Sequence, residues 1–189
     1  MGFDLSPAMG GLPAAGEAPV PSLEARLVAA AREGDRRAFG QLYERFAPMV
    51  HGLLLTRVPR ADVDDLVQDA FLQAMRRLGS LRNAEAFGPW LAAIARNRAR
   101  DRWRRADDAV PLPEEVPGPP HPEGEAVTVL AAIRRLPEAY RETLVLRLVE
   151  GMTGPEIAER TGLTPGSVRV NLHRGLKVLR EALGRSERP

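Results

Sequence analysis

The sequence predicts an all-α fold of two small helical domains, a helical bundle and then a helix-turn-helix, joined by a Pro-rich acidic linker. Apolar residues recur at three- and four-residue steps through most of the chain, and the alternation typical of strands is almost absent. Two stretches lack this periodicity: residues 1–21 contain four Pro, and residues 106–126 contain six Pro and six acids. We therefore expect a disordered tail at 1–21, a linker at 106–126, and domains at 22–105 and 127–189.

The first two predicted helices open the bundle. One covers residues 22–32, and the next begins after Asp35, whose side chain can cap it, and ends at Pro59. The apolar positions of the second helix are Phe39, Leu42, Tyr43, Phe46, Val50, Leu53 and Leu54. Their spacing predicts one buried stripe.

Two more helices complete the predicted bundle. Asp62 can cap the third, and Asp65 in its first turn suits the helix dipole. After a loop at 79–86, the fourth runs from about residue 87 to 105 with Pro89 in its first turn. The inward positions of the two helices are Leu66, Val67, Ala70, Phe71, Ala74, Leu78, Trp90, Leu91, Ile94 and Ala95.

The second domain is expected to begin with a helix from Val127 to Leu136. Pro137 starts the next helix and Gly151 stops it. Its expected buried residues are Tyr140, Leu144, Val145 and Leu148.

The last two helices form a helix-turn-helix. Thr153 and Glu156 have capping-box spacing. Ala158 is small where two helices approach, Gly162 follows where the chain leaves the first helix, and Val168 faces the core. Thr164 and Pro165 are the cap and first position of the long last helix, whose inner stripe is Val168, Leu172, Leu176, Leu179 and Leu183. This packing pattern is typical of DNA-binding helix-turn-helix motifs.

Charge is distributed in blocks. Residues 22–105 carry a net charge of +6 and residues 127–189 carry +4, whereas the linker holds six acids and no base. Basic blocks favour a polyanionic partner, either nucleic acid or an anionic membrane. The chain lacks Cys, a membrane-length apolar run and a secretion signal, so we expect a cytoplasmic protein with no disulfide, no thiolate metal site and no membrane insertion.

The chain resembles an extracytoplasmic-function (ECF, group 4) RNA polymerase sigma factor of the sigma-70 superfamily. Three stretches carry the resemblance: DVDDLVQDAFLQAMRRL at 62–78, FGPWLAAIARNRARDRWRR at 87–105, and the segment from LPEAYRETL to LKVLREAL at 136–183. It implies that 22–105 is sigma region 2, which binds polymerase and the minus-ten strand, and that 127–189 is sigma region 4, which binds the minus-thirty-five duplex. Core RNA polymerase and promoter DNA are the implied partners. An anti-sigma factor is a candidate third, because the family often uses one to bury both DNA-binding faces.

The acidic stretch 62–69 has three interpretations. The resemblance implies a docking surface for the clamp helices of the largest polymerase subunit, made of Asp65, Leu66, Gln68, Asp69 and Phe71. Helix capping with a solvated face is the plain alternative. A metal site is disfavoured, because acids at helical spacing lack the further ligands that hard cations need.

The resemblance places melted minus-ten DNA on the loop 79–86, which forms a pocket for a flipped-out base, and on the helix after it. The implied residues are Arg82, Asn83, Ala84, Trp90, Arg96, Asn97, Arg100, Trp103 and Arg104. Aromatic rings and Arg planes are the usual partners of unstacked bases. Trp90 also sits on the apolar stripe, so a core role is its alternative, and Trp103 fits either role.

On the last helix, the residues that project away from the Leu stripe are candidates for minus-thirty-five DNA: Arg169, Val170, Asn171, His173, Arg174 and Lys177. Residues near the start of a recognition helix reach bases. We therefore expect base contacts from Arg169, Val170 and His173, and phosphate contacts from Arg174 and Lys177. Many family members carry Ser and Arg near 170–171, where this chain has Val170 and Asn171. This departure concerns the base preference and not the binding mode.

These patterns predict a sigma factor that directs promoter recognition and transcription initiation, with a stress or envelope-response regulon as the expected class. The three His do not form a catalytic or metal set, and no motif of an enzyme or a cofactor site occurs. A helix-turn-helix regulator that acts without polymerase is the alternative, but it leaves 62–105 unexplained. A carboxylate nuclease using 62–69 is a third reading.

Overall fold

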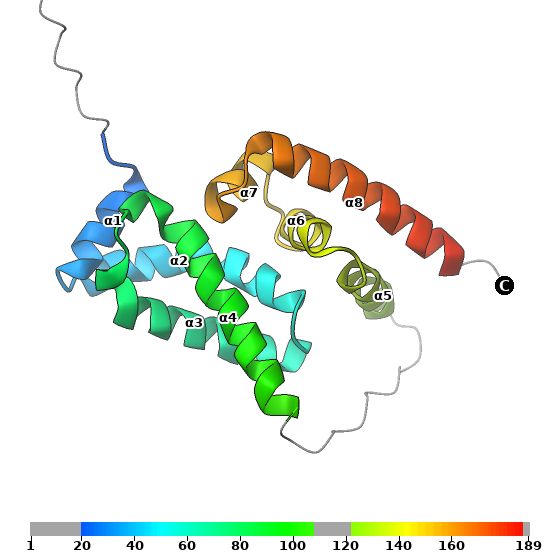
Figure 1. Ribbon diagram of the computed structural model, residues 1–189, viewed down its shortest axis with the longest axis horizontal. Coiled ribbons are helices and arrows are strands. Elements are labelled where there is room, and N and C mark those ends of the chain that lie inside the picture. The colour runs from blue at the N-terminus through cyan, green and yellow to red at the C-terminus, as the bar shows by residue number, and fades with distance from the viewer. Residues whose placement is uncertain (1–19, 108–121, 187–189) are drawn as a thin grey trace, which may run out of the picture.

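The computed structural model describes residues 20–107 and 122–186 (Figure 1). Within these residues the chain forms eight α-helices with short 3-10 turns and no strand, which confirms the predicted all-α fold. The predicted tail, up to residue 19, and most of the predicted linker, 108–121, lie outside the described residues.

Four helices form the N-terminal bundle. Their bounds are α1 Leu23–Arg32, α2 Arg36–Leu55, α3 Val63–Arg77 and α4 Phe87–Asp107. Helix α2 lies at the centre and contacts the other three. Its predicted stripe is buried for most of its length, with Leu42, Phe46, Val50 and Leu53 at most 4% exposed. Burial of this stripe holds the bundle together.

Of the two helix caps predicted for the bundle, the cap at Asp35 is present and the cap at Asp62 is not. Asp35 caps α2, because its carboxylate accepts hydrogen bonds from the N–H groups of Arg37 and Ala38. Asp62 precedes α3 but makes no capping hydrogen bond. Its carboxylate instead forms an ion pair with Arg102 on α4 at 3.0 Å. Attraction to the guanidinium of Arg102 turns this carboxylate toward α4 and away from the first turn of α3.

The C-terminal half contains helices α5 Pro122–Arg134, α6 Glu138–Leu148, α7 Gly154–Thr161 and α8 Pro165–Ser186. Helix α5 begins within the segment expected to be linker, since Pro is tolerated in the first turn of a helix. Helices α7 and α8 form the predicted helix-turn-helix. Figure 1 shows α6 between α8 and the bundle.

Helix α6 is buried on two sides, and this overturns one expectation. Leu148, expected in the core, is 49% exposed, whereas Glu142, Thr143 and Leu146 are at most 7% exposed. The helix packs against α8 on one side and α2 on the other. A helix held between two neighbours has no single apolar stripe, so periodicity selects the wrong positions.

The two halves pack against each other and share one hydrophobic cluster. Contacts join α2 to α6 and α4 to α7. The cluster includes Leu54 and Phe87 of the bundle as well as Leu144 and Ile157 of the C-terminal half. The segments predicted as separate domains are therefore in direct contact in this structure.

Candidate nucleic-acid and partner interfaces

The hydrogen bonds and the glycine turn predicted from the sequence are present in the helix-turn-helix and stabilise it. The Oγ1 of Thr153 accepts a hydrogen bond from the Glu156 N–H, and the Glu156 carboxylate accepts one from the Thr153 N–H at 2.7 Å. This second bond lowers the pKa of Glu156. Gly162 has φ +75°, the left-handed conformation that ends α7 and favours glycine. Ala158 and Val168 are 7% and 1% exposed, so both lie in the core of the motif.

The outer face of α8 is free, because its inner face packs on α6. A Cβ at Gly175 would lie 3.0 Å from Leu144 Cδ1, which shows how closely the two helices approach. Five of the six residues predicted for minus-thirty-five DNA are exposed, namely Arg169, Val170, His173, Arg174 and Lys177. Asn171 is half-buried. This face can therefore meet a duplex without moving α6.

The predicted polymerase-docking residues on α3 divide into two groups. Asp65, Gln68 and Asp69 are exposed. Leu66 and Phe71 are 8% and 3% exposed and so belong to the core. The two apolar side chains therefore position the polar ones more than they present surface of their own.

Beside these residues lies an apolar groove that the sequence analysis missed. Its volume is about 250 Å³, and it is lined by Phe39, Tyr43, Gln68, Phe71, Leu72 and Met75. Tyr43, Leu72 and Met75 are 39%, 46% and 51% exposed. The Tyr43 ring lies 4.6 Å from the Phe71 ring, centroid to centroid. Tyr43 lies at the edge of the predicted buried stripe and not at its centre, a difference that sequence spacing does not show.

The loop before α4 is held to α1. Its tip forms a single 3-10 turn, Ala84–Ala86, which Asn83 caps by accepting a hydrogen bond from the Glu85 N–H. The Ser22 N–H donates to the Glu85 carboxylate at 2.9 Å, and hydrogen bonding from Ser22 lowers the pKa of Glu85. Arg82 and Asn83 are exposed and Ala84 is half-buried, so the loop offers its polar side chains to solvent.

Along α4 the predicted minus-ten residues form an open, basic surface with one exception. The exposed residues are Asn97, Arg100, Trp103 and Arg104, and Arg96 is half-buried. Trp90 is the exception, because it packs against the core with its ring 6.0 Å from that of Phe87. Trp103 is 50% exposed, and its indole N–H donates to the Arg57 carbonyl at 2.6 Å.

A polar cavity of about 440 Å³ lies where α4 meets α6 and the end of α2. It is lined by Thr56, Arg57, Arg96, Ala99, Arg100, Trp103, Glu138 and Arg141. The Nε of Arg141 is buried without a hydrogen-bond partner within the described part of the chain. Four arginines, one carboxylate and the indole of Trp103 therefore share the lining of this cavity.

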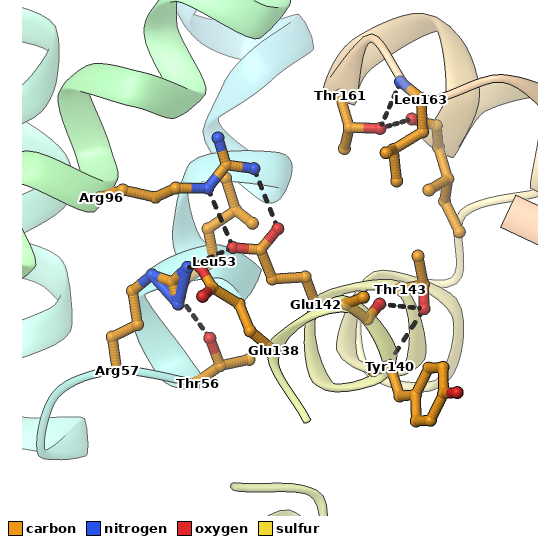
Figure 2. A network of polar contacts seen from close by, with 12 residues as sticks. Leu53, Thr56, Arg57, Arg96, Glu138, Tyr140, Glu142, Thr143, Thr161 and Leu163 are labelled. Atoms are coloured by element: carbon orange, nitrogen blue, oxygen red, sulfur yellow. Dashed lines mark hydrogen bonds and ion pairs between the residues drawn. The ribbon is translucent and has the colours of Figure 1, made fainter. Parts of the chain in front are cut away.

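Two carboxylates from α6 lie against the arginines of this cavity (Figure 2). Glu142 accepts hydrogen bonds from Arg96 Nε at 3.0 Å and Arg96 Nη2 at 2.9 Å, and also from Arg57. Glu138 pairs with Arg57 as well. The bond to Glu142 raises the pKa of Arg96. This contact could not be predicted from the sequence, because a Glu on a helix is usually solvated.

Other functional groups are sparse in the described residues. His51 pairs with Glu150 at 2.8 Å. Residues 20–107 and 122–186 contain no group of three or more His, Asp or Glu arranged to hold a metal ion. None of the helices in the same ranges is long and apolar enough to span a membrane.

Comparison with known proteins gives the class of the chain. Residues 42–108 match the family described as Sigma-70 region 2, and residues 126–179 match Sigma-70, region 4. The RNA polymerase sigma factor CarQ of Myxococcus xanthus is 38% identical over 165 residues, 82% of this chain and 95% of that relative. ECF RNA polymerase sigma factor SigM of Mycobacterium tuberculosis is 35% identical and covers 85% of each chain.

The solved structures agree. The structure of CnrH in complex with the cytosolic domain of CnrY matches with a TM-score of 0.61 and 30% identity, over 88% of this chain and 100% of that one. The sigma factor RpoE of Bartonella quintana, solved with the anti-sigma factor NepR, matches at 24% identity and shows the same fold. Fold and matched regions define a sigma-70 type transcription initiation protein. The chain belongs to the ECF RNA polymerase sigma factors.

Proposed function

We propose that this sigma factor recognises promoters through three separate surfaces. The exposed acids of α3 and the adjoining apolar groove bind core polymerase. The loop before α4 and the outer face of α4 hold the melted minus-ten strand, and the outer face of α8 reads the minus-thirty-five duplex. RNA synthesis itself belongs to the polymerase, so the sigma factor performs no catalysis and needs no cofactor. It acts in the cytoplasm, at promoters of a stress or envelope-response regulon.

The observation that carries this proposal is the free face of α8. Arg169, Val170 and His173 lie together on its first turns, exposed and opposite the face that packs on α6. Arg matches the acceptors of guanine in the major groove, and an exposed Val can contact a thymine methyl group. Arg174 and Lys177 follow further along the helix, where phosphate contacts are expected.

The groove on α3 supports the polymerase role. It combines exposed apolar side chains, Tyr43, Leu72 and Met75, with the acids Asp65 and Asp69 at its edge. An apolar centre with a charged rim is typical of a protein interface. Helix α3 makes its main contacts with α2 and α4, so this face is open in the present arrangement.

In vitro transcription with core polymerase on a promoter library tests the proposal. We expect transcripts from promoters that share two short elements, and we expect Arg169→Ala to change the preferred upstream element only. A matched control is Arg180→Ala on α8, since Arg180 is exposed but beyond the predicted reader residues. Transcription that is independent of this protein, or an unchanged preference in the Arg169 variant, would contradict it.

A further inference from the structure

Helix α1 packs against the segment that joins α3 to α4. It contacts both 3-10 turns of this segment, Leu78–Ser80 and Ala84–Ala86. Figure 1 shows α1 beside the start of α4. The segment contains the loop 79–86, which is proposed above to hold the melted minus-ten strand. None of the residues proposed to contact DNA lies on α1, so a contribution of α1 to base capture acts through this loop.

Arg32, in the last turn of α1, bridges two carbonyl groups at the start of the loop. Its Nε donates to the Leu78 carbonyl at 3.2 Å, and its Nη2 donates to the Leu81 carbonyl. The side chains of Leu78 and Leu81 are 4% and 6% exposed, so both ends of this short turn are also anchored in the core. A planar guanidinium presents several donors in fixed directions and suits two fixed acceptors, whereas the ammonium of Lys is a single point of charge.

The bond to the Leu81 carbonyl sets the direction of the loop. A trans peptide group is planar and holds its C=O and N–H on opposite sides. Because the Leu81 carbonyl faces Arg32, the N–H of Arg82 points away from Arg32. This N–H has no hydrogen-bond partner within residues 20–107 and 122–186, and the Arg82 side chain is exposed. One fixed peptide plane thus turns the polar groups of Arg82 outward.

The other end of the loop is held by the other end of α1. Ser22 caps α1 by accepting a hydrogen bond from the Ala25 N–H at 3.1 Å, and its own N–H donates to the Glu85 carboxylate at 2.9 Å. The start and the tip of the loop are therefore attached to one helix. A loop that is already held in one shape loses less conformational freedom when it binds a ligand.

We propose that Arg32 is a positioning residue for minus-ten base capture, which fixes the loop 79–86 in the shape that receives the base and does not itself touch DNA. The inference rests on the proposed role of this loop. An arginine at the end of a helix has two plainer roles, interaction with the helix dipole and contact with a DNA phosphate. In the described part of the chain, however, the side chain of Arg32 bonds two carbonyls of the loop and no carbonyl of α1.

Three substitutions on α1 separate these roles. Arg32→Gln removes both the bridge and the charge, and Arg32→Lys keeps the charge without the planar fork. Arg26→Gln is the matched control, because Arg26 is exposed on the same helix and its side chain has no partner within the described ranges. Each variant is assembled with core polymerase. The probe is a labelled single strand with the minus-ten sequence found in the promoter library, varied in turn to each base at every position.

Anisotropy at several salt concentrations measures the binding of these strands. We expect Arg32→Gln to reduce the preference for the best base at one position by about tenfold, the scale of one charge-assisted hydrogen bond. The salt slope and the affinity for core polymerase should stay at wild-type values, since neither phosphate contacts nor the docking face of α3 is altered. Arg32→Lys should resemble Arg32→Gln, and Arg26→Gln should resemble the wild type.

The ratio of affinities between bases is the deciding quantity. A residue that only stabilises the bundle would weaken binding of every strand alike, and that result would overturn the inference. A salt slope lowered by about one in Arg32→Gln and restored in Arg32→Lys would assign Arg32 to a phosphate and would also overturn it. Failure of the proposed function is seen in the wild type alone: without any base preference in the minus-ten strand, the loop does not capture a base and Arg32 has nothing to position.

Discussion

Gly88 on α4 and Arg160 on α7 lie so close that a Cβ at position 88 would come within 2.5 Å of the Arg160 carbonyl oxygen. The same atom would lie 3.0 Å from the ring of Phe46. Gly88 has an ordinary helical backbone, so its lack of a side chain serves the contact between the two halves and not a turn.

Gly88→Ala is therefore expected to lower the free energy of unfolding by about 1–3 kcal/mol, the usual cost of overpacking. The control is Gly40→Ala on α2, where a Cβ would meet nothing within 4 Å. That change should raise stability by roughly 0.5–1 kcal/mol, because Ala favours helix interiors over Gly. Urea unfolding measures both, and a stabilised Gly88 variant would show that α4 and α7 do not meet.

The effect of the α3 acids on polymerase binding can be distinguished from a general effect of charge. Asp65→Lys should weaken binding to core polymerase by about tenfold or more, since it reverses a charge on the proposed docking face. The helix itself should lose only about 0.3–1 kcal/mol from the first-turn dipole interaction. Glu159→Lys makes the same charge change on α7 and should leave polymerase affinity nearly unaltered. Equal losses of polymerase affinity in both variants would indicate that the α3 acids act only as helix-capping residues.

Arg169 and Lys177 are expected to behave differently on DNA. Arg169→Ala should cost about 1–3 kcal/mol on the preferred duplex and relax preference at one base pair. Lys177→Ala should weaken binding evenly across sequences and lower the salt slope by about one. Salt titrations of the full chain on several duplexes measure both effects. An even loss for Arg169→Ala would assign that residue to a phosphate.

The capping box of α7 should make stability depend on pH in the acid range. The Thr153 N–H bond holds the pKa of Glu156 below the ordinary 4.5, so its contribution is present above that value and is lost as pH falls through the lowered pKa. The unfolding temperatures of wild type and Glu156→Gln should therefore differ at pH 6, and the difference should shrink as the pH falls below 4.5. A constant difference at every pH would show that the carboxylate charge is irrelevant.

Sequence reasoning succeeded where structure is set by near neighbours. Asp35, Thr153 with Glu156, and Gly162 act within a few residues of themselves, and each forms the cap or turn that its position predicts. Membership of the sigma factor family could also be predicted from the sequence, because the three stretches that resemble the family occur in order along the chain.

The failures concern contacts between residues far apart in the chain. Leu148 is exposed and Glu142 buried because α6 is held between α8 and α2, which local periodicity cannot reveal. Asp62 pairs with Arg102, 40 positions away, instead of capping α3. The groove at Tyr43 and the contact between the two halves depend on the same kind of distant packing. Roles of single residues at the DNA and polymerase surfaces stay predictions.

Arg134 links the order of synthesis to the order of folding. Its guanidinium satisfies the carbonyl of Leu55, 79 residues earlier in the chain. At roughly 5–20 residues per second, a ribosome makes these residues about 4–16 s apart. The end of α2 therefore stays hydrated until α5 has been made. The four-helix bundle can thus fold on the ribosome before the C-terminal half supplies the last hydrogen bonds to it.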